Sequence, residues 1–501
     1  MTGSPSRADL IIRNATLIDG TGAPAVEGDV AVTGDRIVAL GTLPTQAAAV
    51  EIDARGKVVA PGFIDAHTHD DNLLLSDPTM APKASQGVTT VIAGNCGISL
   101  APLALAGAPT PPLDLLGDRS VFRFPRFADY LDQLDATPPA INAAFLVGHM
   151  SLRVGCMDRF DRPATADEIA TMARRLDDSL AAGAIGLSTG LYYKPSEAAP
   201  TDEVISLAKV ARRHDGLYVT HMRNESDRVM TALDETFAIG REAELPVVIS
   251  HHKVIGRRNF GRSAETLPFV AARGGRQPIG FDVYPYIASS TVLSVDRFNA
   301  SERIIVTWSK AKPEVSGRDL ADIAQEMGLS LEDAAATLQP AGAIYFMMDE
   351  ADVQRILKAE RAMIGSDGLP HDVFPHPRLW GTFPRVLGHY ARDLKLFPLH
   401  EAVHKMTGLT AATFGLRDRG VLRVGAFADL VLFDPATVID RATFEAPTRP
   451  AAGIELVLVN GRPVWRAGAP TGERPGRALR RASLDRPLGS WRPAPGAVPA
   501  F

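Results

Sequence analysis

The amino-acid sequence predicts an α/β protein, a TIM (β/α)8 barrel with a small β-sandwich domain built from both chain ends. Eight short apolar runs alternate with helical patterns in the middle of the chain, and short strands separated by Gly- and Asp-rich turns occupy both ends. With 501 residues and 46% hydrophobic content, the chain can bury such a core. We expect the sandwich at 1–60 and 416–470, the barrel at 61–415 and an extended tail at 471–501.

The sandwich is predicted from short strands at the two ends of the chain. Isolated short strands need partners to bury one face, so strands from both ends are expected to pair with one another. The candidate strands lie at 9–14, 16–20, 29–32, 36–40, 428–434, 454–461 and 462–465.

The barrel is predicted from eight apolar runs of strand length. Helical patterns such as 166–182 and 202–214 precede some of these runs, and eight β–α units imply a closed parallel barrel. A helical insertion at roughly 300–355 separates the last two runs, and we expect it to cover a substrate. The runs lie at 58–69, 88–95, 142–149, 184–189, 217–221, 247–251, 279–284 and 362–367.

Composition excludes several classes of partner. The formal net charge is −5 and no long basic run occurs, so nucleic acid and anionic membranes are poor candidate partners. The sequence contains no uncharged apolar stretch of about 18 residues, so we expect no membrane-spanning helix. The first residues lack the apolar core of a signal peptide. Only Cys96 and Cys156 are present, which predicts a cytoplasmic protein with reduced thiols. The oligomeric state is left open.

Polar residues with metal-binding side chains follow five of the predicted strands. In a parallel barrel the chemistry lies at the carboxyl ends of the strands, and two His separated by one residue on a strand share a face. A lone His there is usually structural and a lone buried Cys usually acts as a small hydrophobe. The joint occurrence favours a metal site, whose candidate ligands are His67, His69, Cys96, His221, His251 and Asp367.

Six candidate ligands are more than a single metal ion needs. One Zn²⁺ takes about three or four ligands, so the set predicts room for two ions. Cys96 is the natural bridge between them, because a thiolate coordinates strongly and Zn²⁺ favours nitrogen and sulfur ligands. Cys156 and His252 are interpreted as structural residues.

These motifs resemble a known family. The segment PGFIDAHTH at 61–69 resembles the first-strand motif of the amidohydrolase superfamily. GNCG at 94–97, THMR at 220–223, SHHK at 250–253 and GSDG at 365–368 resemble the D-aminoacylases, or N-acyl-D-amino-acid deacylases, and the match covers about 9–470. The fourth run lacks the Lys that bridges the metals in other branches.

The resemblance implies zinc-dependent hydrolysis of N-acyl-D-amino acids to a carboxylate and a free D-amino acid. It places a tightly bound Zn²⁺ at Cys96, His221 and His251, and a weaker second site at His67, His69, Cys96 and Asp367. Asp367 suits the role of general base and acid. Tyr192, which follows the fourth run, is expected to stabilise the oxyanion, with Tyr193 as its rival.

The substrate contacts follow from the same resemblance. Arg378 resembles the family's carboxylate-binding Arg, with Tyr286 and Ser290 as its hydroxyl partners. Lys253 and Arg297 match positions that contact acidic side chains, which implies a preference for D-glutamate or D-aspartate. The alternative for Lys253 is that it only pairs with a local acid.

Two other functions remain open at this point. The first is another amidohydrolase activity, such as a dihydroorotase-like or hydantoinase-like cyclic-amide hydrolase, or a dipeptidase. Cys96 and the missing Lys of the fourth run argue against the cyclic-amide branch. The second is a non-catalytic scaffold that has kept the barrel, which the complete ligand set argues against.

Overall fold

Eight parallel strands form the barrel in the computed structural model, which describes residues 7–274 and 277–485. The strands are hydrogen-bonded in the order β18-β14-β13-β12-β11-β10-β7-β6. The ring closes between β6 and β18, where Asp367 N donates to His67 O at 2.8 Å and Thr68 bridges Gly368. The predicted barrel is therefore confirmed, with strands β6 (Phe63–Asp65), β7 (Val88–Ala93), β10 (Asn142–Gly148), β11 (Gly186–Gly190), β12 (Leu217–His221), β13 (Val247–Ile249), β14 (Ile279–Val283) and β18 (Ala362–Ile364).

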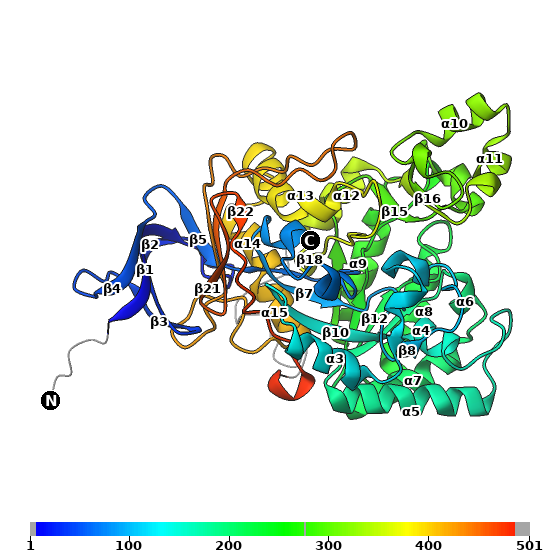
Figure 1. The fold of residues 1–501 in the computed structure, drawn as a ribbon, viewed down its shortest axis with the longest axis horizontal. Coiled ribbons are helices and arrows are strands. Elements are labelled where there is room, and N and C mark those ends of the chain that lie inside the picture. Colours follow the sequence, from blue (N-terminus) through cyan, green and yellow to red (C-terminus); the bar gives the residue numbers. More distant parts are fainter. Residues whose placement is uncertain (1–6, 275–276, 486–501) are drawn as a thin grey trace.

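Helices surround the barrel and bury one face each against it. Figure 1 shows α5 along one side of the barrel. In α5 the Thr165 side chain and Glu168 form a capping box at the N-terminus, and Met172 and Leu176 are fully buried. The outer helices are α3 (Phe127–Ala136), α5 (Ala166–Ala182), α7 (Thr201–Arg213), α8 (Val229–Glu242), α9 (Ser263–Gly274), α12 (Glu350–Lys358), α14 (Leu399–Met406) and α15 (Gly408–Phe414). The remaining helices of the barrel domain include α1 (Leu73–Ser76), α2 (Ala81–Ala84), α4 (His149–Val154), α6 (Lys194–Glu197), α13 (Arg378–Arg385) and the π-helical η6 (Val386–Asp393).

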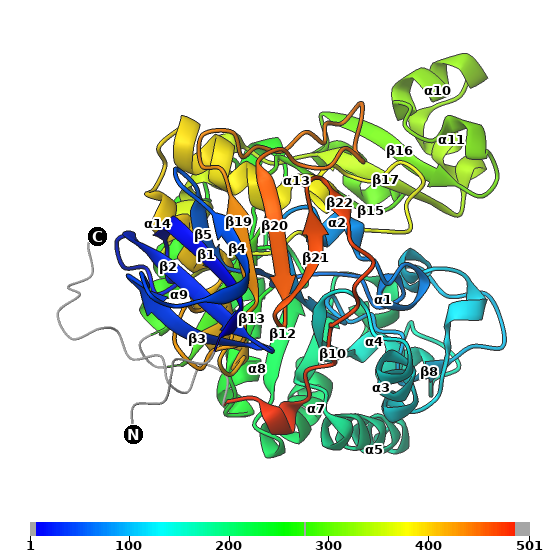
Figure 2. The same cartoon turned by 60° about the vertical axis from the view of Figure 1, so that its left-hand side comes forward.

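Strands from both chain ends form one continuous sheet of nine strands, so the two ends pair as the sequence predicts. Figure 2 shows the N-terminal strands in blue beside the C-terminal strands in orange and red. The order is β22-β21-β20-β19-β5-β1-β2-β3, and β4 pairs with β1. The strands are β1 (Ala8–Leu17), β2 (Val26–Thr33), β3 (Arg36–Gly41), β4 (Ala48–Asp53), β5 (Val58–Pro61), β19 (Leu430–Phe433), β20 (Ile454–Val459), β21 (Arg462–Arg466) and β22 (Ala469–Pro470).

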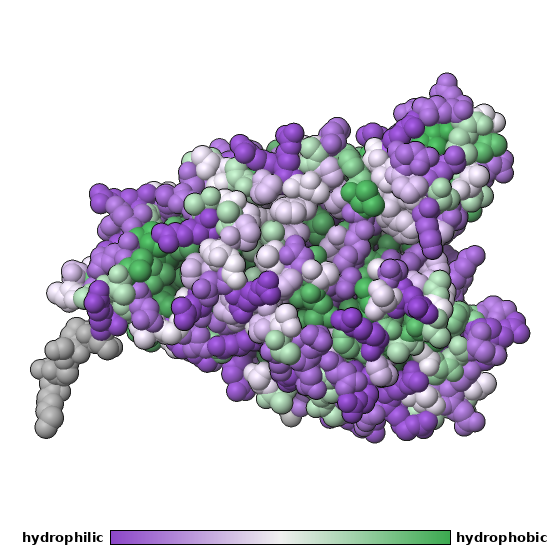
Figure 3. Space-filling view, in the orientation of Figure 1, coloured by the Kyte–Doolittle hydropathy of each residue, from purple (hydrophilic) through white to green (hydrophobic). Residues whose placement is uncertain are grey.

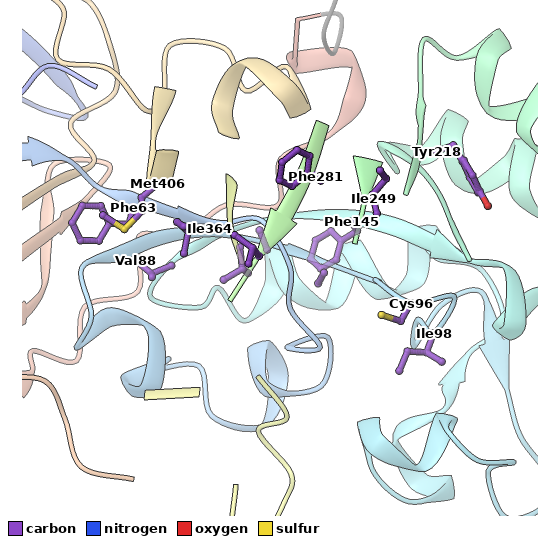
Figure 4. Packing of buried hydrophobic residues seen from close by; sticks show 14 of the residues in the cluster. Phe63, Val88, Cys96, Ile98, Phe145, Tyr218, Ile249, Phe281, Ile364 and Met406 are labelled. Atoms are coloured by element: carbon purple, nitrogen blue, oxygen red, sulfur yellow. The ribbon is translucent and has the colours of Figure 1, made fainter. Parts of the chain in front are cut away.

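The first apolar run is split between the sheet and the barrel. β5 pairs with β19, whereas β6 pairs with β7. Gly62 lies between them, and a Cβ added there would lie 2.1 Å from the Thr89 side chain. A residue without a side chain is therefore required where the chain passes from the sheet into the barrel. The main buried cluster continues through this junction, with Phe63 and Met406 at one side of the view in Figure 4.

The sequence predicted a helical insertion before β18, but the insertion also contains a β-sheet. It holds a three-stranded antiparallel sheet, β15 (Ala288–Val292), β17 (Ala341–Phe346) and β16 (Arg303–Ser309), together with α10 (Leu320–Met327) and α11 (Leu331–Leu338). The helical pattern of 319–338 dominated the sequence signal, and the short strands beside it were missed. The insertion projects from the barrel in Figures 1 and 3, and it has an apolar cluster of its own that includes Leu320 and Tyr345.

The segment after β22 does not lie loosely on the surface over its described part. Leu479 N donates to Ala143 O at 2.7 Å, and the Leu479 side chain is 7% exposed. Residues 471–485 thus pack against the barrel, and the predicted extended conformation of 486–501 lies outside the described residues. Among the helices of the described ranges, none is long and apolar enough to cross a membrane.

Candidate metal centre

The candidate ligands lie in the turns immediately after the barrel strands, except His221, which is the last residue of β12. β7, β13 and β18 end two or three residues earlier than the sequence patterns suggest, so Cys96, His251 and Asp367 follow the strands. All three have a positive φ, of 54°, 37° and 50° respectively. Non-glycine residues in this region cost of the order of 1–3 kcal/mol and cluster at functional sites. The backbone is therefore held in a specific form where these side chains meet.

The six predicted ligands form two groups that share Cys96. One contains His67, His69, Cys96 and Asp367, the other Cys96, His221 and His251, and in each group the ligand atoms lie within 4.8 Å of one another. Cys96 Sγ lies 3.3 Å from His67 Nε2 and 3.4 Å from His251 Nε2. The structure therefore brings together, from five strand ends, all six side chains that the sequence singled out.

Within each group, two further pairs of ligand atoms lie close together: His251 and His221 in the second group, and His69 and Asp367 in the first. His251 Nε2 lies 3.0 Å from His221 Nδ1, and His69 Nε2 lies 3.2 Å from Asp367 Oδ1. Ligands at about 2.0–2.3 Å from a tetrahedral zinc ion lie about 3.3–3.8 Å apart. The separations in both groups are close to this range, and the nitrogen, sulfur and carboxylate donors are those that zinc prefers. The side chains thus fit zinc.

The electrostatic environment of the centre favours ionised ligands. Burial raises the pKa of the Cys96 thiol, but the neighbouring His67 and His251 outweigh burial and hold that pKa well below its usual range. Burial likewise raises the pKa of the Asp367 carboxyl, but the Arg378 guanidinium and His67 hold it well below its usual range. Thiolate and carboxylate are the forms that coordinate a metal ion.

Two buried acids that the sequence analysis missed hold the histidines in place. Glu225 Oε1 lies 3.0 Å from His251 Nδ1, and Glu225 Oε2 lies 3.6 Å from His221 Nε2. Asp282 Oδ1 accepts a hydrogen bond from His251 N at 2.9 Å and lies 3.2 Å from His67 Nδ1. Carboxylates in this position fix the orientation of metal-binding imidazoles. Asp282 could have been noticed as a charged residue inside an apolar run, whereas Glu225 lies in a loop without a distinctive pattern.

A pocket opens beside the two groups, and several predicted substrate contacts line it. Ser290, Lys253 and Arg297 line this pocket together with the candidate ligands. Lys253 Nζ donates to Glu225 Oε1 at 2.7 Å, so its charge is already paired. Arg297 is 4% exposed, its guanidinium lies 4.4 Å from the centre of the Tyr192 ring, and it forms no ion pair with a carboxylate of the described ranges. Of the two cations, Arg297 is the one with unpaired charge.

Arg378 lies at the edge of the same site. It is fully buried, its Nη1 lies 2.9 Å from Asp367 Oδ2, and its Nη2 donates to Ser290 O at 3.2 Å. Its Nε has no hydrogen-bond partner among the described residues. The guanidinium lies 4.5 Å from the centre of the Tyr284 ring, and Lys253 Nζ lies 5.7 Å from the same ring. Both cations therefore lie near the ring of Tyr284, which the sequence did not single out.

Two of the predicted hydroxyl groups point elsewhere. The Tyr286 ring lies under the Arg385 guanidinium, and its hydroxyl faces Gly381 rather than the pocket. Tyr192 stacks on His221 but donates its hydroxyl to Asp296. The backbone at both positions is irregular, so strand alternation does not predict the direction of either side chain.

Tyr193 lines the pocket in place of Tyr192. Its ring centre lies 5.0 Å from that of His221, and its hydroxyl lies 3.0 Å from Thr291 Oγ1. His252 points away from the ligands, because its Nε2 lies 2.9 Å from Thr266 Oγ1. The structure thus agrees with the interpretation of His252 as a structural residue.

A parallel barrel with six metal-binding side chains at its strand ends defines the class of metal-dependent barrel hydrolases, and sequence comparison identifies the family. The profile of the Amidohydrolase family matches residues 50–269 and 279–465. A D-aminoacylase of Alcaligenes xylosoxydans xylosoxydans is 59% identical over 475 residues, covering 95% of this chain and 98% of the relative. The chain therefore belongs to the amidohydrolase family and, within it, to the D-aminoacylases.

Two further relatives from Alcaligenes xylosoxydans xylosoxydans act on acidic substrates. An N-acyl-D-aspartate deacylase is 53% identical, with 95% of this chain and 96% of the relative covered. An N-acyl-D-glutamate deacylase is 48% identical, with 95% of this chain and 97% of the relative covered. The chain thus lies within a group whose members differ in the amino-acid side chain of the substrate.

Solved structures show the same fold. The crystal structure of a D-aminoacylase matches with a TM-score of 0.93 and 59% identity, over 94% of this chain and 100% of that one. The N-acyl-D-glutamate deacylase of Bordetella bronchiseptica, complexed with zinc and a phosphonate that mimics the tetrahedral intermediate, matches with a TM-score of 0.92 and 47% identity, over 95% and 100%. These matches confirm the predicted barrel and terminal β-module.

Proposed function

We propose that the protein is a zinc-dependent N-acyl-D-amino-acid deacylase, which hydrolyses the amide bond to release a carboxylate and a free D-amino acid. The observation that carries this proposal is the position of Arg378, whose Nη1 lies 2.9 Å from Asp367 Oδ2. A carboxylate-binding cation is thereby in direct contact with a carboxylate of the metal centre, so the substrate's α-carboxylate and its scissile amide can be bound next to each other. The close relatives named D-aminoacylase and N-acyl-D-glutamate deacylase support the same reaction.

The metal would be held by the two groups that share Cys96. Cys96, His221 and His251 would hold the tighter ion, because Glu225 contacts His251 Nδ1 at 3.0 Å and its second carboxylate oxygen lies 3.6 Å from His221 Nε2. His67, His69, Cys96 and Asp367 would hold the weaker one. Zinc, when bound, supplies the Lewis acidity that activates water and polarises the amide carbonyl.

The protein's own residues perform the remaining steps. Arg378 binds the substrate α-carboxylate through its free Nε edge, beside the pocket-lining Ser290. Asp367 accepts a proton from the attacking water and returns it to the leaving nitrogen. The oxyanion donor is assigned to the Tyr192–Tyr193 pair: Tyr193 already lines the pocket, whereas Tyr192 must first release Asp296.

The amino-acid side chain is proposed to be acidic. Arg297 lines the pocket with a buried guanidinium, and its Nε has no hydrogen-bond partner among the described residues. An unpaired buried charge is costly, and a D-glutamate or D-aspartate side chain would pair with it. The relatives that hydrolyse N-acyl-D-aspartate and N-acyl-D-glutamate support this choice of substrate.

The protein is also proposed to be cytoplasmic, because a metal-binding thiolate at Cys96 requires a compartment in which thiols stay reduced.

The test is the release of free amino acid from N-acetyl-D- and N-acetyl-L-amino acids by the zinc-loaded protein. We expect turnover of the D series and at least about 100-fold lower kcat/KM for the L series, because the Arg378 contact and the metal centre fix two points of a chiral substrate. Hydrolysis of hydantoin or dihydroorotate without any hydrolysis of N-acetyl-D-amino acids would instead support a cyclic-amide hydrolase. Inactivity toward all of these would support the scaffold.

A further inference from the structure

The pocket at the metal centre has two walls of opposite chemistry. The loops after β11, β12, β13 and β14 supply a polar wall of phenol, hydroxyl, carboxylate and cationic side chains. The loops after β7 and β18 supply an apolar wall that consists of Ile98, Leu115 and Leu369. Cys96, which both ligand groups share, and Asp367, which belongs to one of them, also line the pocket, and they lie two residues before Ile98 and Leu369 respectively.

The two walls suit the two halves of a linear amide. The carbonyl carbon of an N-acyl amino acid bears the nitrogen and the charged amino-acid half on one side and the acyl chain on the other. Arg297 and Ser290, which the proposed function assigns to the amino-acid half, belong to the polar wall, and Arg378 contacts Ser290 O. With the carbonyl at the metal centre, the acyl chain extends toward the opposite wall.

We propose that Ile98, Leu115 and Leu369 form the acyl subsite and select a short, uncharged acyl group. This inference rests on the proposed function. The three side chains are 1%, 5% and 2% exposed, and all belong to the main buried cluster of the protein. Figure 4 shows Cys96 and Ile98 together at one edge of that cluster. Because these side chains are part of the closely packed core, they cannot shift enough to accommodate a longer acyl group.

Leu115 is fixed by the turn on which it lies. It belongs to η1 (Leu113–Leu116), in which Leu113 and Leu116 are fully buried. These neighbours anchor the turn in the core, and Leu115 faces the pocket. An anionic acyl group such as succinyl would meet no cation on the apolar wall, so the subsite also rejects charge.

The test compares N-acetyl-, N-butyryl-, N-hexanoyl- and N-succinyl-D-glutamate with the zinc-loaded protein. We expect the wild type to prefer acetyl over hexanoyl and succinyl by about tenfold or more in kcat/KM. Leu115→Ala should raise the ratio of hexanoyl to acetyl turnover about tenfold, and Leu115→Phe should lower the ratio of butyryl to acetyl turnover. Neither variant should change the ratio between N-acetyl-D-glutamate and N-acetyl-D-leucine.

Leu113→Ala is the matched control, since Leu113 lies in the same turn and is buried without lining the pocket. It should leave both ratios unchanged. Acyl ratios that stay constant in Leu115→Ala and Leu115→Phe, with N-acetyl-D-glutamate still hydrolysed, would overturn the subsite. If a Leu115 variant does not fold, Leu369→Val tests the same wall from the other loop. Wild-type inactivity toward every acyl derivative would overturn the proposed function instead.

Discussion

Lys253 Nζ lies 2.7 Å from Glu225 Oε1, and the same oxygen lies 3.0 Å from His251 Nδ1. One buried carboxylate therefore neutralises a lysine of the pocket and orients a histidine of the metal centre. The sequence analysis left two readings of Lys253 open, substrate contact or local ion pair, and the structure shows the ion pair. Lys253 and Arg378 are thus each paired with a carboxylate of the site, whereas Arg297 forms no ion pair among the described residues.

Glu225→Gln should weaken zinc binding at the tighter site about 10- to 100-fold, because the amide removes the charge that contacts His251 and faces His221. The measurement is the zinc Kd by competition with a chelator. Lys253→Met is the comparison, since it keeps the carboxylate of Glu225 beside both histidines and removes only the Lys253 amine, which lies 2.7 Å from Glu225 Oε1 and 2.8 Å from His251 Nδ1. Equal losses of affinity in the two variants would mean that Glu225 acts only as the partner of Lys253.

Cys96→Ala should reduce the zinc content of the purified protein at both sites, because Cys96 is common to the two ligand groups. Removal of a shared thiolate affects each ion that it bridges. Cys156→Ala is the matched control, because the Cys156 thiol donates a hydrogen bond to Leu152 O outside the metal centre. Zinc analysis of both proteins checks this prediction, and a Cys96→Ala protein with the wild-type zinc content would remove the thiolate from the centre.

Asp367→Asn should keep zinc in the group of Cys96, His221 and His251 while kcat falls about 10²- to 10⁴-fold, the usual contribution of a general acid–base catalyst. The variant removes the carboxylate that transfers the proton, whereas Cys96, His221 and His251 all remain to bind zinc. Steady-state kinetics and zinc analysis on the same preparation separate the two effects. Retention of more than about a tenth of the wild-type kcat would exclude Asp367 as the proton carrier.

Arg297→Leu should lower kcat/KM for N-acetyl-D-glutamate about 10- to 100-fold, the effect of losing one hydrogen-bonded charge pair of about 1.5–3 kcal/mol. N-acetyl-D-leucine should become the better substrate, because the pocket loses an unpaired buried cation. Arg257→Leu is the control: this Arg is exposed and pairs with Glu302. An unchanged preference in Arg297→Leu would assign the side-chain pocket elsewhere.

The sequence predicted the ligands better than the side chains that contact the substrate. His67, Cys96 and Asp367 could be found because each follows an apolar run, and barrel topology brings strand ends together. Glu225 was missed because its place in the site depends on a loop path that no periodicity encodes. The directions of the Tyr192 and Tyr286 hydroxyls could not be predicted, because consecutive residues in turns do not follow the alternation of a strand.

The fold shows the same division. Strand–helix alternation predicted the barrel, and paired short strands at the two ends predicted the composite sheet. The sheet inside the insertion was missed, because helical segments separate its strands β15, β16 and β17 along the chain, and the local sequence does not show which strands pair. Tertiary pairing of this kind outweighs the local pattern.

The most direct test is a titration of the metal-free protein with zinc while the hydrolysis of N-acetyl-D-glutamate and of its L enantiomer is followed. We predict no turnover without zinc, turnover of the D enantiomer that rises with the first equivalent bound, and at most about a hundredth of that kcat/KM for the L enantiomer. Full activity without zinc, or equal turnover of both enantiomers, would contradict the assignment of this protein as a zinc-dependent N-acyl-D-amino-acid deacylase.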